Sequence, residues 1–151
     1  MKDLSLHILD IVENSIEANA SKIRIKINED IKKDLLIIEI KDNGKGMDEE
    51  TLKTVTDPFH TTRTTRRVGL GLSLLVQATK ESNGNFEIKS KTNKGTEIKA
   101  TFQYSHIDRK PLGDINSTLT TLMIAHPEIN FIYEYQNEEG SYVLDSKEIL
   151  R

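Results

Sequence analysis

The 151-residue chain contains no cysteine and no tryptophan, and it has only three prolines. Without cysteine, a disulfide framework, a zinc site built on thiolates and a thiol nucleophile are all excluded. The aromatic residues are four tyrosines and four phenylalanines, too few for an extended base-stacking surface. The formal net charge of −3 gives no general bias toward nucleic acid. These absences point away from secreted disulfide scaffolds and from nucleic-acid-binding proteins.

Long apolar runs are also missing. No stretch approaches the roughly 20 apolar residues that a membrane-spanning helix needs. The N-terminal residues lack the architecture of a signal peptide, because acidic residues soon interrupt the apolar positions. At this length the chain can bury a core without disulfides or a structural metal. We therefore expect a cytoplasmic domain with neither a membrane nor a nucleic-acid partner.

Hydrophobic periodicity predicts helices alternating with pairs of strands. Helices are predicted over residues 4–20, 49–55, 70–82 and 114–125. Strands are predicted over residues 22–28, 35–41, 85–91, 96–104, 131–135 and 142–144, the first two forming a hairpin. Asp48 is expected to cap the second helix. Residues 56–67 have no periodicity and are predicted to form a loop.

The segment Asp42-Asn43-Gly44-Lys45-Gly46-Met47 follows an apolar strand. One carboxylate and two glycines at a strand end form a turn whose backbone can lie close to a flat ligand. The same composition is equally typical of an ordinary tight turn. The choice between the two readings depends on the segments around this turn.

The first predicted helix carries a polar stripe opposite its isoleucines. Asp10, Glu13, Asn14 and Glu17 recur at helical spacing and share one face. A solvated face is the simplest explanation of this stripe. The functional alternative is a divalent cation, because Mg²⁺ prefers oxygen ligands and often takes one side chain together with waters and phosphate oxygens. In that case Asn14 supplies the amide oxygen, and Asp10 orients or deprotonates a nucleophile.

A second glycine cluster, Gly69-Leu70-Gly71-Leu72, opens the third predicted helix. Free backbone N–H groups at a helix N-terminus attract phosphate. Threonines and arginines precede the cluster in the predicted loop, which can close over a triphosphate and neutralise it. An ordinary loop with a solvated basic patch is the alternative. The cluster is neither a P-loop nor a dinucleotide fingerprint, because it lacks both Gly-Lys-Ser/Thr and a third glycine.

Four motifs occur in order along residues 6–102. They are Glu13-Asn14-Ser15-Ile16-Glu17-Ala18-Asn19-Ala20, Asp42-Asn43-Gly44-Lys45-Gly46-Met47, Asp57-Pro58-Phe59-His60-Thr61-Thr62 with Gly69-Leu70-Gly71-Leu72, and Lys94-Gly95-Thr96. Together they resemble the GHKL superfamily of ATP-binding domains, which includes sensor histidine kinases, anti-sigma-factor kinases, and gyrase-type and mismatch-repair ATPases. The resemblance implies an α+β two-layer sandwich of the Bergerat type, a mixed, mostly antiparallel sheet with helices on one face.

The resemblance also implies roles for individual residues. Asn14 matches the Mg²⁺ ligand, Asp42 matches the acceptor of the adenine amine, and Thr96 matches a threonine that assists on the adenine side. Gly44 and Gly46 belong to the adenine turn. The loop over residues 56–68 matches the ATP lid of the family, and Gly69-Leu70-Gly71-Leu72 matches its glycine box. The resemblance implies that these two segments bind the phosphates of ATP, through Thr61, Thr62, Arg63, Arg66, Arg67, Gly69, Leu70, Gly71 and Leu72.

The lid and glycine motifs look most like those of histidine kinase catalytic domains. Because the first predicted helix starts almost at Met1, we nevertheless expect no dimerisation helix upstream of it. His7 lacks the surroundings of a phosphoacceptor. Asp10 stands where hydrolytic ATPases and anti-sigma kinases carry a glutamate as general base, although it could instead hydrate the metal. The resemblance therefore implies a Mg²⁺-dependent, ATP-binding protein kinase that phosphorylates a separate partner on histidine or serine. An ATP-gated binding module and a slow ATP hydrolase are the alternatives.

Residues 1–104 are expected to form the nucleotide-binding domain and residues 105–151 a C-terminal extension with a helix and a hairpin. The extension begins with His106-Ile107-Asp108-Arg109 and Pro111-Leu112-Gly113-Asp114, which resemble segments of short stand-alone bacterial ATP-binding proteins. A local salt bridge is the simplest role for Asp108 and Arg109. The sequence specifies neither the partner protein nor the oligomeric state.

Overall fold

The computed structural model describes residues 4–56, 67–106, 109 and 112–149. Its helices are α1 Leu4–Glu17, α2 Glu49–Thr56, α3 Arg67–Glu81, α4 Ile115–Ala125 and α5 Ser146–Ile149. Its strands are β1 Lys22–Asp30, β2 Leu35–Asp42, β3 Asn85–Lys91, β4 Gly95–Gln103, β5 Asn130–Asn137 and β6 Gly140–Asp145. None of the helices in these residues has the length and apolar character that crossing a membrane requires.

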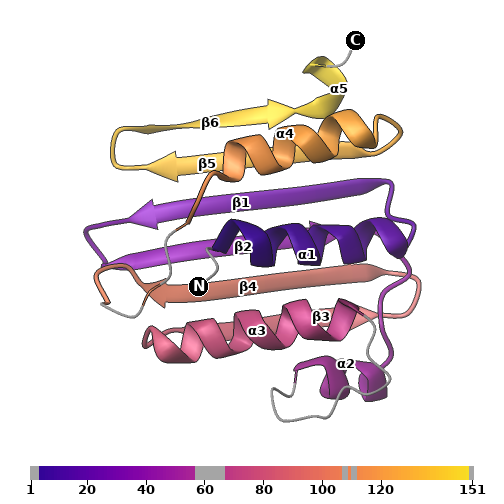
Figure 1. Ribbon diagram of the computed structural model, residues 1–151, viewed down its shortest axis with the longest axis horizontal. Coiled ribbons are helices and arrows are strands. Elements are labelled where there is room, and N and C mark those ends of the chain that lie inside the picture. The colour runs from indigo at the N-terminus through magenta and orange to yellow at the C-terminus, as the bar shows by residue number, and fades with distance from the viewer. Residues whose placement is uncertain (1–3, 57–66, 107–108, 110–111, 150–151) are drawn as a thin grey trace.

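One six-stranded sheet forms the back layer, in the order β3-β4-β2-β1-β5-β6. All of its pairings are antiparallel except that of β5 with β1, which is parallel. Figure 1 shows α1, α3 and α4 side by side across one face of this sheet. The predicted fold class, two α+β layers with a mixed, mostly antiparallel sheet, is confirmed.

The core lies between these helices and the sheet face beneath them. Along β1, Ile23, Ile25 and Ile27 are fully buried, while the lysines and arginine between them point to the other face. This alternation is the period of two that a strand with one covered face requires. Tyr133 and Phe102 are the largest side chains in the core.

Asparagines in the left-handed conformation end both long helices. Asn19 has φ 61°, and Ala20 N–H donates to the Ser15 carbonyl, so α1 stops at Glu17. Asn83 ends α3 in the same way with φ 54°. Each end is a Schellman motif with asparagine in place of the usual glycine. The predicted extension of the first helix to residue 20 was therefore wrong.

The third helix begins earlier than predicted, at Arg67 instead of residue 70. Its glycines thus lie in the first turn and do not precede the helix. Glycine lowers helix stability by about 1 kcal/mol, and packing of α3 against both α1 and α2 offsets this cost. Of the predicted loop over 56–67, Thr56 ends α2 and Arg67 starts α3. Residues 57–66 lie outside the described part of the chain.

The C-terminal residues extend the sheet beyond β1. Strand β5 runs parallel to β1, with Ile25 opposite Tyr133, and β6 returns beside it. Phe131 N–H donates to the buried Ser146 hydroxyl at 2.8 Å, which fixes the end of the hairpin. Helix α4, capped by Asp114, covers these strands.

A carboxylate in the β1–β2 turn holds the chain as it leaves β4. Asp34 accepts hydrogen bonds from Gln103 Nε2 at 3.1 Å, from Ser105 N–H at 2.9 Å and from Ser105 Oγ at 2.8 Å. The Ser105 hydroxyl, followed by Gln103, lowers the pKa of this carboxyl below its ordinary value of 3.8. The bonds favour the ionised form because a carboxylate is the better acceptor.

We expect Asp34→Asn to lower the free energy of unfolding at about pH 7, and the deficit to shrink toward about pH 3. The folded pKa is depressed, so the ionised carboxylate contributes stability above the ordinary pKa, and this contribution disappears as the pH falls through the folded pKa. Urea unfolding at both pH values measures the effect. Asp30→Asn, at the start of the same turn, is the control, because Asp30 accepts a single N–H, which the asparagine oxygen can still accept. A deficit that is equal at both pH values would contradict this account.

Candidate active site

The turn Asp42–Met47 lies at one end of the sheet, together with three other elements. The C-terminal end of α1 and the turn between β3 and β4 lie at this end (Figure 1). Gln103 N–H donates to the Ser82 carbonyl, so α3 ends at the far end of β4. The N-terminus of α3 therefore points back toward the turn.

The Asp42 carboxylate is the chemical centre of this end. It is 9% exposed and accepts two hydrogen bonds, from Ser15 Oγ at 2.6 Å and from Gly44 N–H at 2.8 Å. The two bonds reach different carboxylate oxygens, so each oxygen keeps lone-pair capacity for a further donor. The arrangement is a fixed, largely buried anionic acceptor at the end of a strand.

Asn43 fastens the turn to the start of β1. Its side-chain oxygen accepts the backbone N–H groups of Ser21 at 2.9 Å and Lys22 at 3.0 Å. Its amide nitrogen donates to Ser21 Oγ at 2.9 Å. Two residues later, Lys45 N–H donates to the Ala18 carbonyl at 2.9 Å. The turn is thus held against the loop that leaves α1.

The β3–β4 hairpin holds the other side of the turn Asp42–Met47. Ser90 Oγ accepts Met47 N–H at 2.8 Å and lies 2.8 Å from Thr96 Oγ1. Thr96 is directly opposite Asp42 in the pairing of β4 with β2. The predicted adenine-side residues, Asp42 and Thr96, are therefore neighbours on adjacent strands.

Backbone crowding explains two glycines here. Gly46 has φ +67°, and a Cβ on it would lie 2.0 Å from the Lys91 carbonyl oxygen. Gly95 has φ +102°, and a Cβ on it would lie 2.1 Å from the Asp42 carbonyl oxygen. Only glycine fits both positions, because the two turns are packed directly on each other. The close approach predicted at Gly46 thus serves the protein itself, whether or not a ligand also uses it.

The polar stripe of α1 runs toward this end of the sheet. Asp10, Glu13 and Asn14 are partly buried and Glu17 is exposed. Asp10 and Asn14 are one turn apart on the same face. The described residues contain no group of three or more acidic, histidine or cysteine side chains able to hold a metal. A cation bound at Asn14 would take its remaining ligands from water or from a bound anion.

The second glycine cluster forms the first turn of α3, where Gly69, Leu70 and Gly71 follow Arg67. Because α3 begins at Arg67, the N–H groups up to that of Leu70 have no partner within the helix, whereas the Gly71 N–H is placed to donate to the Arg67 carbonyl. Leu72 is 3% exposed and belongs to the core. Thr61, Thr62, Arg63 and Arg66 lie outside the described residues.

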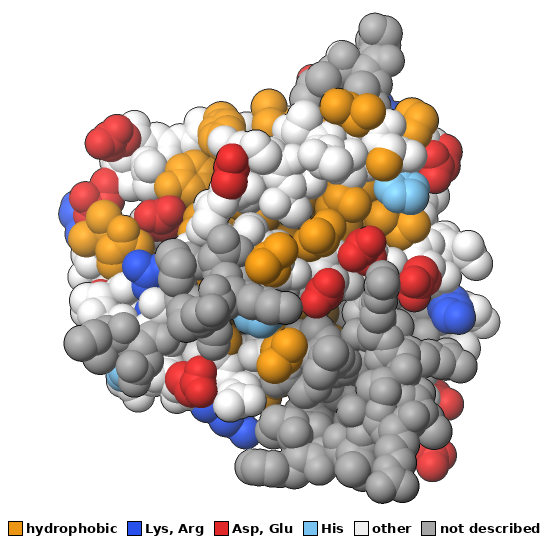
Figure 2. All heavy atoms as spheres, in the orientation of Figure 1, with side chains coloured by type: hydrophobic (Ala, Val, Ile, Leu, Met, Phe, Trp, Pro, Cys, Tyr) orange, Lys and Arg blue, Asp and Glu red, His pale blue; other side chains and the backbone are white. Residues whose placement is uncertain are grey.

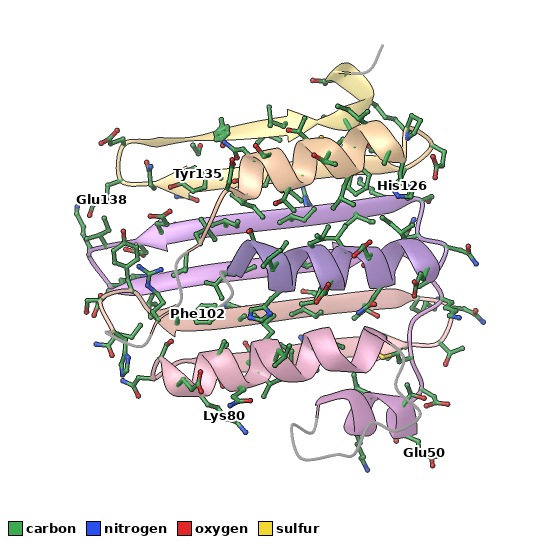
Figure 3. All side chains as sticks on the ribbon, in the orientation of Figure 1. Glu50, Lys80, Phe102, His126, Tyr135 and Glu138 are labelled. Carbon is green, nitrogen blue, oxygen red and sulfur yellow. The ribbon has the colours of Figure 1, made fainter. Side chains whose placement is uncertain are left out.

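A hollow opens beside Asp42 at the same end of the sheet. Its lining residues come from β2, β3, β4 and the β3–β4 turn, namely Lys41, Asp42, Lys89, Ser90, Lys91, Lys94, Gly95, Thr96 and Glu97. In Figure 3, Glu50 marks the nearby α2, while Tyr135 and Glu138 mark the opposite end of the molecule. The candidate residues that the structure describes on β2 and β4 thus lie at the end of the sheet near α2.

Sequence reasoning named no role for Ser15 or Ser90, which hold Asp42 and its turn. One signal for Ser15 was available. It lies four residues after Ile11 and three after Val12, on the buried side of α1, and is itself 3% exposed. A serine among buried apolar positions requires a polar partner. Ser90 offered no such signal, because Met47, whose N–H it accepts, lies 43 residues away in the sequence.

Comparisons with known proteins agree with this geometry. A sensor protein from Shewanella frigidimarina (strain NCIMB 400) is 37% identical over 103 residues, covering 67% of this chain and 16% of that protein. The sensor histidine kinase YxdK from Bacillus subtilis (strain 168) is 31% identical over 106 residues, covering 67% of this chain and 33% of that protein. The chain therefore spans a third or less of the length of these curated relatives.

Two solved structures share the fold at 19% sequence identity. The N-terminal domain of a DNA repair protein has a TM-score of 0.64, covering 96% of this chain and 53% of its own. The Aquifex aeolicus MutL ATPase domain, solved with ADP, has a TM-score of 0.56, covering 91% and 60%. The fold is therefore the predicted Bergerat type.

The family model of the histidine kinase-, DNA gyrase B- and HSP90-like ATPases matches residues 2–106, which contain the Asp42 turn, the α1 stripe and the start of α3. The chain belongs to this family of ATPase domains, as the four motifs predicted.

Proposed function

We propose that this domain binds ATP with Mg²⁺ and transfers the γ-phosphoryl group to a histidine or serine of a separate protein. Membership of an ATPase family supports nucleotide binding. The ADP bound to the MutL domain of the same fold supports it further. The name of the Bacillus relative, a sensor histidine kinase, supports phosphoryl transfer. The observation that carries the proposal is the buried Asp42 carboxylate, fixed by Ser15 and Gly44.

Asp42 is proposed to select adenine. Its carboxylate offers only acceptors, and the exocyclic amine of adenine is a donor. Guanine carries a carbonyl oxygen at the corresponding position, which would leave the carboxylate facing another acceptor. Thr96, opposite Asp42, is proposed to assist on the same side of the ring.

Asn14 and the start of α3 are proposed to hold the triphosphate end. Asn14 fits Mg²⁺ as one neutral oxygen ligand, with waters and phosphate oxygens completing the shell. When bound, the ion would neutralise phosphate charge. The N–H groups of Gly69 and Leu70, at the positive end of the α3 dipole, suit phosphate oxygens, and Gly71, which has no side chain, is proposed to let the phosphates lie close to the helix. The lid arginines are proposed to add positive charge there.

Asp10 is proposed as the general base. It lies one turn before Asn14 on the same face of α1 and is partly buried. A carboxylate in this position can take the proton from an attacking hydroxyl or imidazole. Residues 105–151 are proposed to form an extension to the nucleotide-binding domain of residues 1–104.

Asp42→Asn is expected to weaken ATP binding at least about tenfold, because an N–H donor replaces one acceptor beside the donor amine of adenine. Isothermal titration measures the affinity, and Asp30→Asn at the opposite end of β1 is the control. The parent protein should bind GTP at least about a hundredfold more weakly than ATP. Equal ATP affinity in Asp42→Asn, or equal affinity of the parent for the two nucleotides, would rule out the role of Asp42.

Ser15→Ala should destabilise the protein by about 1–3 kcal/mol, because the buried Asp42 oxygen loses its hydroxyl donor. It should also weaken ATP binding, since the carboxylate is then held on one side only. Thermal unfolding and ATP titration test both effects, and Ser15→Thr should restore part of each. If the alanine variant binds ATP like the parent protein, Ser15 does not position Asp42.

Asp10→Asn should reduce phosphoryl transfer by about two orders of magnitude or more while ATP affinity is retained. The assay uses ATP labelled at the γ-phosphate with a lysate of the source organism, and Glu17→Gln on the same stripe is the control. A labelled protein band that Asp10→Asn abolishes supports the kinase. Phosphate release without a partner would indicate a hydrolase, and ATP-dependent co-purification without label an ATP-gated binding module. Transfer that is unchanged in Asp10→Asn would remove Asp10 from the base role.

A further inference from the structure

The sheet face opposite the helices carries ordered rows of charged side chains. Across the middle of this face the pairing places Glu87 opposite Lys99, Lys99 opposite Glu39, and Glu39 opposite Lys26. Lys26 in turn pairs with Glu134 on β5, and their charged groups are 3.9 Å apart. Every cation in this row stands between carboxylates, which is the stabilising arrangement for cross-strand neighbours.

The next row, at the end of the sheet that carries the Asp42 turn, breaks this alternation. Lys89 pairs with Glu97 and Glu97 with Lys41, but Lys41 then stands directly opposite Arg24. Like charges on directly opposed residues destabilise a sheet. This pairing therefore opposes folding stability and calls for another explanation.

Further lysines surround this row. We call the six exposed cations at this end of the open face the basic patch: Lys22, Arg24, Lys41, Lys89, Lys91 and Lys94. Among the described residues, no carboxylate lies within ion-pair distance of any of the six. Such a concentration is notable in a chain of net charge −3. On the helix side, shown in Figure 2, the coloured lysine and arginine side chains are instead scattered around the rim.

The patch has a definite size and boundary. Four adjacent strands carry its main row, which is therefore about 14 Å wide at the normal strand spacing. The carboxylates of Glu39 and Glu87 in the middle row limit it along the strands. The hollow beside Asp42 is lined by Lys41, Lys89 and Lys91, so the patch reaches the proposed nucleotide end.

We propose that the basic patch docks a short acidic segment of a partner protein. An extended segment of four or five residues matches the width of the row. A nucleic acid or a membrane surface would extend beyond the patch and meet Glu39 and Glu87 of the middle row as well as Glu97, whereas a short acidic segment along the main row would meet Glu97 alone, between the cations on either side of it. Docking needs no nucleotide, so it can be tested without ATP and independently of the proposed kinase activity.

The test compares two charge-reversed variants of the full chain. Lys22→Glu with Arg24→Glu alters the patch without touching the hollow beside Asp42, whereas Lys32→Glu with Lys33→Glu makes the same change in net charge at exposed positions of the β1–β2 turn, at the other end of the sheet. Neither pair belongs to the proposed nucleotide site, so ATP titration on both variants checks that the fold and the site are intact. The probe is fluorescein-labelled hexaglutamate, with hexaglutamine as the neutral peptide, and binding is read by fluorescence anisotropy at low salt.

The parent protein should bind hexaglutamate and not hexaglutamine, with an affinity that falls as salt rises. The patch variant should lose about tenfold or more in affinity, and the variant in the β1–β2 turn should change only about twofold. Failure of hexaglutamate to bind the parent, or equal losses in the two variants, would overturn the proposal. Tighter binding of a ten-nucleotide DNA strand or of phosphatidylserine vesicles, lost in the patch variant, would overturn the assignment to a protein partner.

Discussion

The hydrogen bond from the Ser15 hydroxyl to the Asp42 carboxylate joins the first helix to the end of a central strand. Burying a carboxylate is costly unless donors satisfy it, and here a hydroxyl and the Gly44 N–H do so. The same helix carries Asn14 one residue before Ser15 and Asp10 one turn earlier. Together with the bond from Lys45 N–H to the Ala18 carbonyl, this contact sets the distance between the candidate adenine, metal and base positions.

The turn around Asp42 is held from two sides, and this explains its composition. Asn43 binds the start of β1, and Ser90 binds Met47 from the β3–β4 hairpin. Gly46 and Gly95 are required because the two turns touch through their backbones. The site therefore lies at the junction of three separate segments, with the N-terminus of α3 at the same end of the sheet.

Much of this arrangement could be predicted from sequence because periodicity, caps and turn residues act locally. The alternation of Ile23, Ile25 and Ile27 predicted β1. The family motifs predicted that the turn Asp42–Met47 belongs to a nucleotide site. Other features depend on partners far apart in the chain. The parallel pairing of β5 with β1 has no local signature, and Ser90 meets Met47 only after both hairpins have formed. The end of α1 was misplaced because Asn19 adopts a conformation more typical of glycine.

The most direct measurement of the central claim is an amide NMR titration of the ¹⁵N-labelled protein with ADP. The Gly44 N–H is bonded to Asp42, so a ligand that donates to this carboxylate must alter its resonance. We expect Gly44 and Ser15 to shift together and saturably, while Gly140, the first residue of β6 at the far end of the sheet, stays fixed. Saturable shifts that leave Gly44 unmoved, or no shifts at all, would contradict the assignment of Asp42 as the adenine acceptor.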